Sequence, residues 1–240
     1  VLDPAAVARL FERAELAALE EGYARVLRIR VPTPLPAREA ALAPAPSALR
    51  AYIARPVLEQ LDAGHADWLA EFRRVSTLFL RVSGIDYAGA EALERLHAAT
   101  RAVQMAVERF EGSFQRLLCD DKGTGMLCVW GIPGRAHEDD AARALAAARA
   151  AAASLQALGL RCGSGIATGR ALCGPSGGGG RCEYTVTGDA VNLAARLMVA
   201  SGDELLCDGE TALAAREAFT CEALAPMQVK GRTEALPVFR

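Results

Sequence analysis

Residues 184–198 of this chain read Tyr-Thr-Val-Thr-Gly-Asp-Ala-Val-Asn-Leu-Ala-Ala-Arg-Leu-Met. The first four residues are rich in β-branched side chains and predict a strand, which ends at Gly188. A helix is predicted to begin at Asp189, a favoured N-cap residue, because apolar side chains recur at helical spacing, namely Val191, Ala194, Ala195 and Met198. A strand, a tight turn and an amphipathic helix therefore follow one another directly.

Asn192 and Arg196 lie four residues apart in this helix, so their side chains project from the same side. That side is displaced from the apolar stripe. An amide and a guanidinium that project together from a helix just after a strand can hold a phosphate or a ribose oxygen. On spacing alone the pair is more simply a solvated polar face, and the rest of the chain is needed to choose between the two interpretations.

The composition limits the classes of protein to which this chain can belong. It has 240 residues, 52% of them hydrophobic, and a formal net charge of −2 from 27 basic and 29 acidic side chains, which predicts one substantial core. No basic patch or tail points to nucleic acid or an anionic membrane as a partner. No run approaches the roughly 18 apolar residues of a membrane span, and no signal peptide is recognisable. The chain opens on Val1 rather than Met, which suggests a fragment of a longer protein.

Seven cysteines occur, and none of their spacings matches a zinc site. Several lie in apolar, strand-like runs, as Cys128 does. Buried, reduced thiols are therefore expected, and with them a cytoplasmic location. The three histidines are scattered without paired ligand spacing, so no metal-binding residue is predicted in this chain.

The residue patterns divide the chain into three segments. Residues 1–46 are expected to form an N-terminal helix, from an apolar stripe over residues 4–23, and then a Pro/Ala-rich linker. Residues 47–71 are expected to be a helical lead-in. Residues 72–240 alternate between strand-like and helix-like patterns and are predicted to form the main domain.

Strands and helices of the main domain follow one another in the order β-α-β-β-α-β, with additions. This order predicts an α+β fold, a ferredoxin-like sandwich with a mostly antiparallel central sheet and helices packed on one of its faces. Expected strands cover residues 75–82, 114–119, 126–130, 160–168 and 184–187, and expected helices cover residues 88–110, 138–153 and 189–198.

The glycine-rich segment 174–180 invites comparison with a phosphate-binding loop. A P-loop requires a Lys followed by Ser or Thr at its end and opens a helix, whereas this segment has no Lys and leads into a strand. A tolerated surface loop is therefore the simpler interpretation.

With these elements placed, the chain from about residue 72 onward resembles the class III nucleotidyl cyclase catalytic domains. The motifs that carry the resemblance stand in the family's order at residues 121–134 (Asp-Lys-Gly-Thr-Gly-Met-Leu-Cys-Val-Trp-Gly-Ile-Pro-Gly), 165–169 (Gly-Ile-Ala-Thr-Gly) and 183–198, with terminal runs at 229–232 and 237–239. The Asp-Lys-Gly hairpin and the lead-in at 49–58 look most like the second (C2) domain of the bicarbonate-responsive soluble adenylyl cyclases.

In that family two cyclase domains pair head to tail and ATP lies between them. One half holds two Mg²⁺ or Mn²⁺ ions with two aspartates, and the other half contacts the base, the ribose and the phosphate. Carried over by motif position, the resemblance implies that Asn192 orients the ribose and that Arg196 stabilises the charge on the α-phosphate. It also implies that Thr185 and Arg116 contact the adenine. Arg116 replaces the family's lysine, which changes the geometry of the donors.

Arg81 stands where the resemblance places the first metal-binding aspartate, and Asp120 or Asp121 lies near the place of the second. A cation at Arg81 would repel a divalent metal ion. The resemblance therefore implies an adenylate cyclase half-domain, a phosphorus–oxygen lyase that converts ATP into cyclic AMP and pyrophosphate. It would act only with a C1-type cyclase domain, expected on the same polypeptide, that holds the metal ions.

Two other functions are compatible with the same residues. A degenerate cyclase fold could serve as a non-catalytic nucleotide-binding, dimerisation or regulatory module, and Arg81 and Arg116 leave room for it. An RNA-binding ferredoxin-like sheet is disfavoured, because no pair of aromatic residues is placed to stack bases.

Overall fold

The computed structural model describes residues 3–10, 12–30, 50, 53, 58, 62–64, 70–120, 123–178, 181–228 and 235–240. The chain divides into two compact units, Val1–Pro46 and Ser47–Arg240. The predicted Pro/Ala-rich linker, most of the predicted lead-in and the run 229–232 lie outside the described residues. No helix among the described residues is long and apolar enough to cross a membrane.

The first unit contains one short helix and a β-hairpin. Helix α1 (Pro4–Leu10) ends where the predicted helix over residues 4–23 should have continued, and β1 (Ala14–Ala18) and β2 (Ala24–Ile29) pair antiparallel instead. The turn between them places Glu21 and Gly22 at positive φ, a conformation that a continuing helix cannot contain. The prediction of a helix was therefore wrong beyond residue 10.

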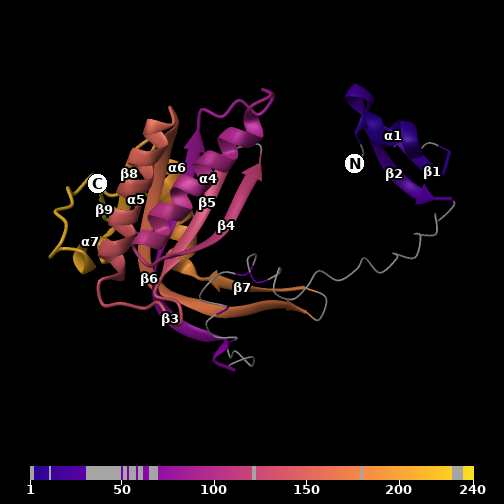
Figure 1. The fold of residues 1–240 in the computed structure, drawn as a ribbon. Coiled ribbons are helices and arrows are strands. Elements are labelled where there is room, and N and C mark those ends of the chain that lie inside the picture. Colours follow the sequence, from indigo (N-terminus) through magenta and orange to yellow (C-terminus); the bar gives the residue numbers. More distant parts are fainter. Residues whose placement is uncertain are drawn as a thin grey trace. The chain divides into compact units, whose positions relative to one another are not determined.

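The second unit is built on a seven-stranded sheet in which β4, β5, β3, β6, β8 and β9 lie in this order and β7 pairs with β6 (Figure 1). All pairings are antiparallel except that of β6 with β8. The predicted α+β sandwich with a mostly antiparallel sheet is confirmed. The strands are β3 (Glu71–Ser83), β4 (Ser113–Asp120), β5 (Gly123–Trp130), β6 (Arg161–Gly178), β7 (Arg181–Thr187), β8 (Leu205–Asp208) and β9 (Val238–Phe239).

Helices cover both faces of this sheet. On one face, α4 (Ala92–Arg109) and the Ala-rich α5 (Asp140–Ala157) pack on the main core, which includes Leu78 and Leu80 (Figure 1). On the opposite face, α6 (Asp189–Ala200) packs on Phe79, because successive side chains of β3 point to opposite faces. The expectation of helices on a single face was therefore wrong for α6. A short helix, α7 (Gly209–Ala214), follows β8.

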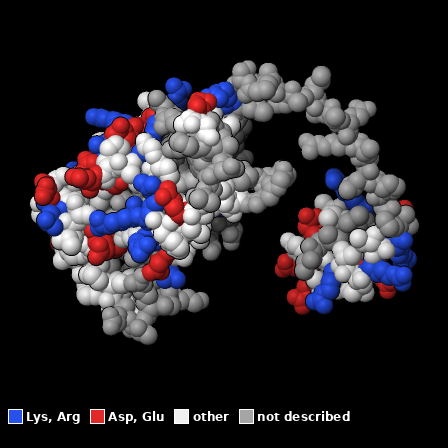
Figure 2. All heavy atoms as spheres, turned by 90° about the horizontal axis from the view of Figure 1, so that it is seen from below, with Lys and Arg blue, Asp and Glu red and all other residues white. Residues whose placement is uncertain are grey.

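The surface of the second unit mixes the two signs of charge. On the face seen in Figure 2, Arg side chains are interspersed with Asp and Glu side chains. This distribution accompanies a formal net charge of only −2. Any charged binding site must therefore be sought in local groupings of side chains rather than in the net field of the protein.

Glycines of β6 let α6 lie directly against the sheet backbone. A Cβ atom on Gly165 would come within 3.0 Å of the carbonyl oxygen of Ala194 and the amide nitrogen of Met198, closer than real Cβ contacts. A Cβ on Gly163 would clash in the same way with the carbonyl of Gly202, just after the helix. The missing side chains therefore fix the height of α6 above β6.

Gly165→Ala is expected to lower the free energy of unfolding by at least about 2 kcal/mol, because either α6 or β6 must move to admit the methyl group. The measurement is urea-induced unfolding. Gly125→Ala in β5 is the matched control, since its Cβ would lie 3.9 Å from the Cβ of Leu118, at ordinary contact distance. Equal stability of the two variants would contradict this account of the α6 contact.

Candidate functional site

Helix α6 carries the two residues that the sequence singles out. Its N-cap is Gly188, so Asp189 belongs to the first turn and the prediction that it caps the helix was wrong. Its carboxylate still lies at the positive end of the helix dipole. The buried side chains are one position earlier than the predicted stripe, and they are Ala190, Leu193, Ala194 and Leu197.

Asn192 and Arg196 project from the side of α6 that is turned away from this buried stripe. Asn192 is exposed and Arg196 is half-buried, and their Cα atoms are separated by about 6 Å along the helix axis. Among the described residues, neither side chain has a partner in a hydrogen bond or an ion pair. An amide and a guanidinium are thus presented together, with their donors available to a ligand.

Strand β7 leads directly into α6 and carries the other predicted contact residue, Thr185. Thr185 is half-buried and pairs with Gly174 of β6. Glu183, two residues earlier, projects from the same face of β7 because side chains alternate along a strand. The Nη2 atom of Arg116, on β4, donates a hydrogen bond to Oε1 of Glu183 at 2.9 Å. The structure therefore brings Arg116 to the strand that carries Thr185.

Sequence reasoning assigned no role to Glu183. Arg116 and Glu183 are 67 residues apart in the chain, and both side chains are about half exposed, at 46% each. The only signal in the sequence is the opposite charge of Glu183, placed two residues before Thr185 in a strand. That signal does not show that the fold brings Arg116 of β4 and Glu183 of β7 into contact.

The opposite face of β7 anchors the strand. Val186 is buried in a cluster with Val75 and Cys173, and Tyr184 packs against this cluster. Burial raises the pKa values of both Tyr184 and Cys173, so the phenol and the thiol are neutral at pH 7. With one face held by an uncharged cluster, the other face presents Glu183 and Thr185.

Arg81 of β3 has a structural role in the turn after α6. Its Nη2 donates to the carbonyl oxygen of Gly202 at 3.0 Å, and in the sheet it lies opposite Gly125 and Gly163. The small neighbours leave room for the guanidinium on this face. Arg81 thus ties the sheet to the C-terminal end of α6.

The residues around Arg81 do not fit a divalent metal ion. The guanidinium carries a positive charge, and no group of three or more His, Cys, Asp or Glu side chains in the described part of the chain could hold a metal ion. Asp121 lies outside the described residues, as does the side chain of Asp120. No metal-dependent step is therefore placed at Arg81.

A pocket of about 310 Å³ opens beside the first turn of α6. Asp189, Arg170 and Asp208 line it, whereas Asn192 and Arg196 do not. The Oδ1 atom of Asp208 accepts hydrogen bonds from the amides of Thr211 at 2.9 Å and Thr168 at 3.3 Å, so this carboxylate caps α7. Burial raises the pKa of Asp208. This pocket is thus built around a helix cap.

Comparison with known proteins relates the chain to nucleotide cyclases. No family model matches the chain. Human adenylate cyclase type 10 is 30% identical over 171 residues, and the rat protein of the same name is 32% identical over 167 residues. Both matches cover 68% of this chain and 10% of the relative, so the chain spans about a tenth of the length of these proteins.

Solved structures share the fold. The adenylyl cyclase CyaB from P. aeruginosa superposes with a TM-score of 0.66 and 20% identity, covering 72% of this chain and 95% of that chain. The guanylyl cyclase Cya2 superposes with a TM-score of 0.62 and 22% identity, covering 71% of this chain and 92% of that chain. The sheet with α4 and α5 on one face and α6 on the other is therefore the fold of the cyclase domains.

The sequence matches and the shared fold agree with the motifs at residues 165–169 and 183–198, which form β6, β7 and α6. The chain belongs to the class III nucleotidyl cyclase family.

Proposed function

We propose that this domain is one half of an adenylate cyclase, which converts ATP into cyclic AMP and pyrophosphate when it pairs with a C1-type cyclase domain. The observation that carries the proposal is the presentation of Asn192 and Arg196, which project together from α6 without partners among the described residues. Both donors are therefore available to the ribose and the phosphate of a nucleotide.

In this reaction the 3′-oxygen of the ribose attacks the α-phosphorus, and the bond from that phosphorus to the pyrophosphate oxygen breaks. The proton of the 3′-hydroxyl leaves, and pyrophosphate departs with the bonding electrons. Asn192 orients the ribose, and Arg196 donates to the α-phosphate oxygens as negative charge grows on them. Donors held in place before the reaction need little reorganisation, which is the main source of their effect on rate.

The divalent ions, Mg²⁺ or Mn²⁺, belong to the partner domain in this proposal. When bound, they lower the pKa of the attacking hydroxyl and neutralise phosphate charge. Arg81 supports this division, since the resemblance carries the family's first metal-binding aspartate over to this position, where a guanidinium hydrogen-bonded to Gly202 stands. The isolated domain is therefore expected to be inactive, and the partner is expected on the same polypeptide.

ATP is the proposed substrate because the resemblance to the family carries the base-contacting role over to Thr185 and Arg116. A threonine hydroxyl and a guanidinium can both face adenine, whereas guanylyl cyclases usually carry Glu and Cys there. The human and rat relatives are adenylate cyclases by name, which supports the same choice. Free buried thiols, such as those of Cys128 and Cys173, support a reducing, cytoplasmic location.

A second candidate function is a non-catalytic cyclase fold that binds nucleotide or serves as a dimerisation or regulatory module. Arg81 favours it, because its guanidinium is bound to the carbonyl oxygen of Gly202 and serves the structure without a metal ion. The reconstitution experiment below separates the two functions.

Arg196→Ala is expected to lower kcat by about 10²–10³, because a preorganised cation is lost from the charge that develops on the α-phosphate. The assay measures cyclic AMP formation by the domain mixed with its C1-type partner and Mg²⁺ or Mn²⁺. Arg216→Ala, at an exposed arginine just after α7, is the control and should retain activity. Activity that is unchanged in Arg196→Ala, or absent from the wild-type pair, would overturn the catalytic proposal.

Glu183→Gln is expected to raise KM for ATP several-fold with little change in kcat. The ion pair at 2.9 Å holds the half-exposed side chain of Arg116 in place. Without it, Arg116 must be ordered when ATP binds, which weakens binding. Glu204→Gln is the matched control, since Glu204 forms an exposed pair of the same length with Arg240. An unchanged KM in Glu183→Gln would show that the ion pair does not position Arg116 for the base.

A further inference from the structure

A second concave site lies far from α6 in the fold, on the other face of the sheet. A groove of about 580 Å³ runs between the outer side of α4 and the beginning of β4. It is called the α4 groove here, and its principal lining residues are Arg101, Met105, Glu108, Arg109, Phe114 and Arg135. Its volume lies within the range of about 300–1,000 Å³ that is usual for small-molecule sites.

One row of α4 side chains forms a wall of the groove. Arg101, Met105 and Arg109 follow one another at intervals of four residues, so they lie along one side of the helix over about 12 Å. Met105 is 64% exposed, although it is a large apolar side chain. The wall therefore presents an apolar surface between two cations.

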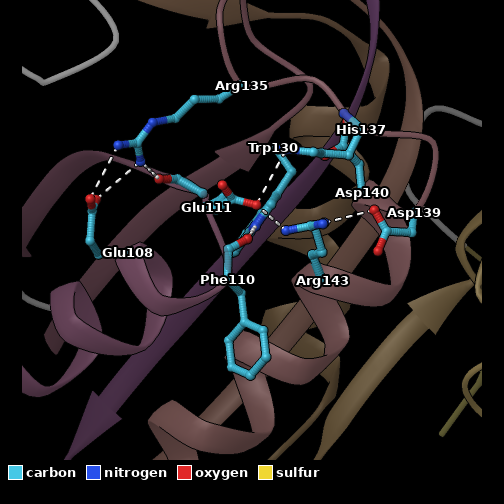
Figure 3. A network of polar contacts seen from close by, with 10 residues as sticks. Glu108, Phe110, Glu111, Trp130, Arg135, His137, Asp139, Asp140 and Arg143 are labelled. Carbon is cyan, nitrogen blue, oxygen red and sulfur yellow. Dashed lines mark hydrogen bonds and ion pairs between the residues drawn. The ribbon is translucent and has the colours of Figure 1, made fainter.

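The floor of the groove is fixed by an ion pair (Figure 3). Both terminal nitrogens of Arg135 donate to the carboxylate of Glu108, each at 3.1 Å, and Nη1 also donates to the carbonyl oxygen of Gly112 at 3.1 Å. The side chain of Arg135 is only 11% exposed. Because these two charges neutralise each other, the positive charge offered to a ligand is that of Arg101 and Arg109.

The surrounding structure holds the groove open. The indole of Trp130 donates to the carbonyl oxygen of Phe110 at 2.8 Å, and its ring fills the space where a side chain at residue 112 would lie. The guanidinium of Arg109 stacks over the ring of Phe110 at 5.4 Å from its centroid. The turn between α4 and β4 is therefore rigid, and one of the two cations is already oriented.

Two other pockets of the same unit have the opposite balance of charge. The pocket at the other end of α4, of about 250 Å³, is lined by Glu91, Glu94 and one arginine, Arg95. The pocket beside α6 is lined by three carboxylates and one arginine. The excess of arginine in the α4 groove is thus a local property and not a reflection of the whole surface.

We propose that the α4 groove binds a small organic anion with an apolar body, of the class of aromatic carboxylates and sulfonates. The apolar body would cover Met105 and Phe114, and the acid group would accept hydrogen bonds from Arg101 or Arg109. The size of the groove, its exposed methionine and its two cations, which have no carboxylate partner among the described residues, all match this class. The site is separate from the residues proposed for catalysis, so it stands whether or not the domain is a cyclase.

The test uses the full chain labelled with ¹³C at the methionine methyl groups and titrated with anilinonaphthalene sulfonate at low salt. The chain has four methionines, at positions 105, 126, 198 and 227, so each methyl signal can be assigned with a Met→Leu variant. The Met105 signal is expected to shift with saturation at one equivalent, while the signal of buried Met126 stays in place. A saturating shift at Met198 or Met227 without one at Met105 would overturn the proposal.

Charge recognition is tested with the neutral analogue phenylnaphthylamine and with a double variant, Arg101→Gln/Arg109→Gln. The double variant is expected to weaken sulfonate binding by about tenfold and to leave binding of the neutral analogue unchanged. Arg95→Gln, on the same helix but outside the groove, is the control and should bind as the wild type does. Equal affinity for both compounds, or no loss in the double variant, would show a merely apolar surface and refute anion binding.

Discussion

The contact of α6 with the backbone of β6 is the constraint on which the candidate catalytic site depends. At Gly165 the helix backbone occupies the space that a side chain would need, and at Gly163 the following turn does the same. Because α6 is held against β6 in this way, the side of the helix that carries Asn192 and Arg196 keeps a fixed orientation relative to the sheet. The positions of Asn192 and Arg196 therefore follow from two residues of β6 that have no side chain, rather than from any contact that the donors make themselves.

The same constraint explains which features of α6 the sequence could and could not predict. The strand, the turn and the helix were predictable, because β-branched residues, a glycine and a helical periodicity follow one another. The buried stripe was misplaced by one residue, since apolar side chains occur at adjacent positions such as Leu193 and Ala194 and at Leu197 and Met198. Periodicity cannot choose between two nearly equivalent faces. Gly163 and Gly165 of β6 decide which face of α6 is buried, because the helix packs against them. The sequence does not show that α6 packs on β6.

Two other differences have the same origin in non-local pairing. The apolar spacing of residues 4–23 suits a helix, but β1 and β2 pair across a turn with Glu21 and Gly22 at positive φ. The ion pair of Arg116 with Glu183 joins residues 67 positions apart. Local propensity reports the backbone that a segment prefers by itself, whereas these features depend on which segments meet. The order of strands and helices in the main domain was nevertheless predictable, because each of its long elements has a strong pattern of its own.

Arg81 disfavours metal binding at its position and, at the same time, stabilises the turn that ends α6. A guanidinium in this place is incompatible with a divalent ion, yet its hydrogen bond to the carbonyl of Gly202 holds the turn that ends α6. An aspartate would repel that carbonyl oxygen instead of donating to it. Arg81 thus joins the sheet to the turn that ends the helix carrying Asn192 and Arg196. Under the proposed function, the same residue makes this domain depend on its partner for the metal ions.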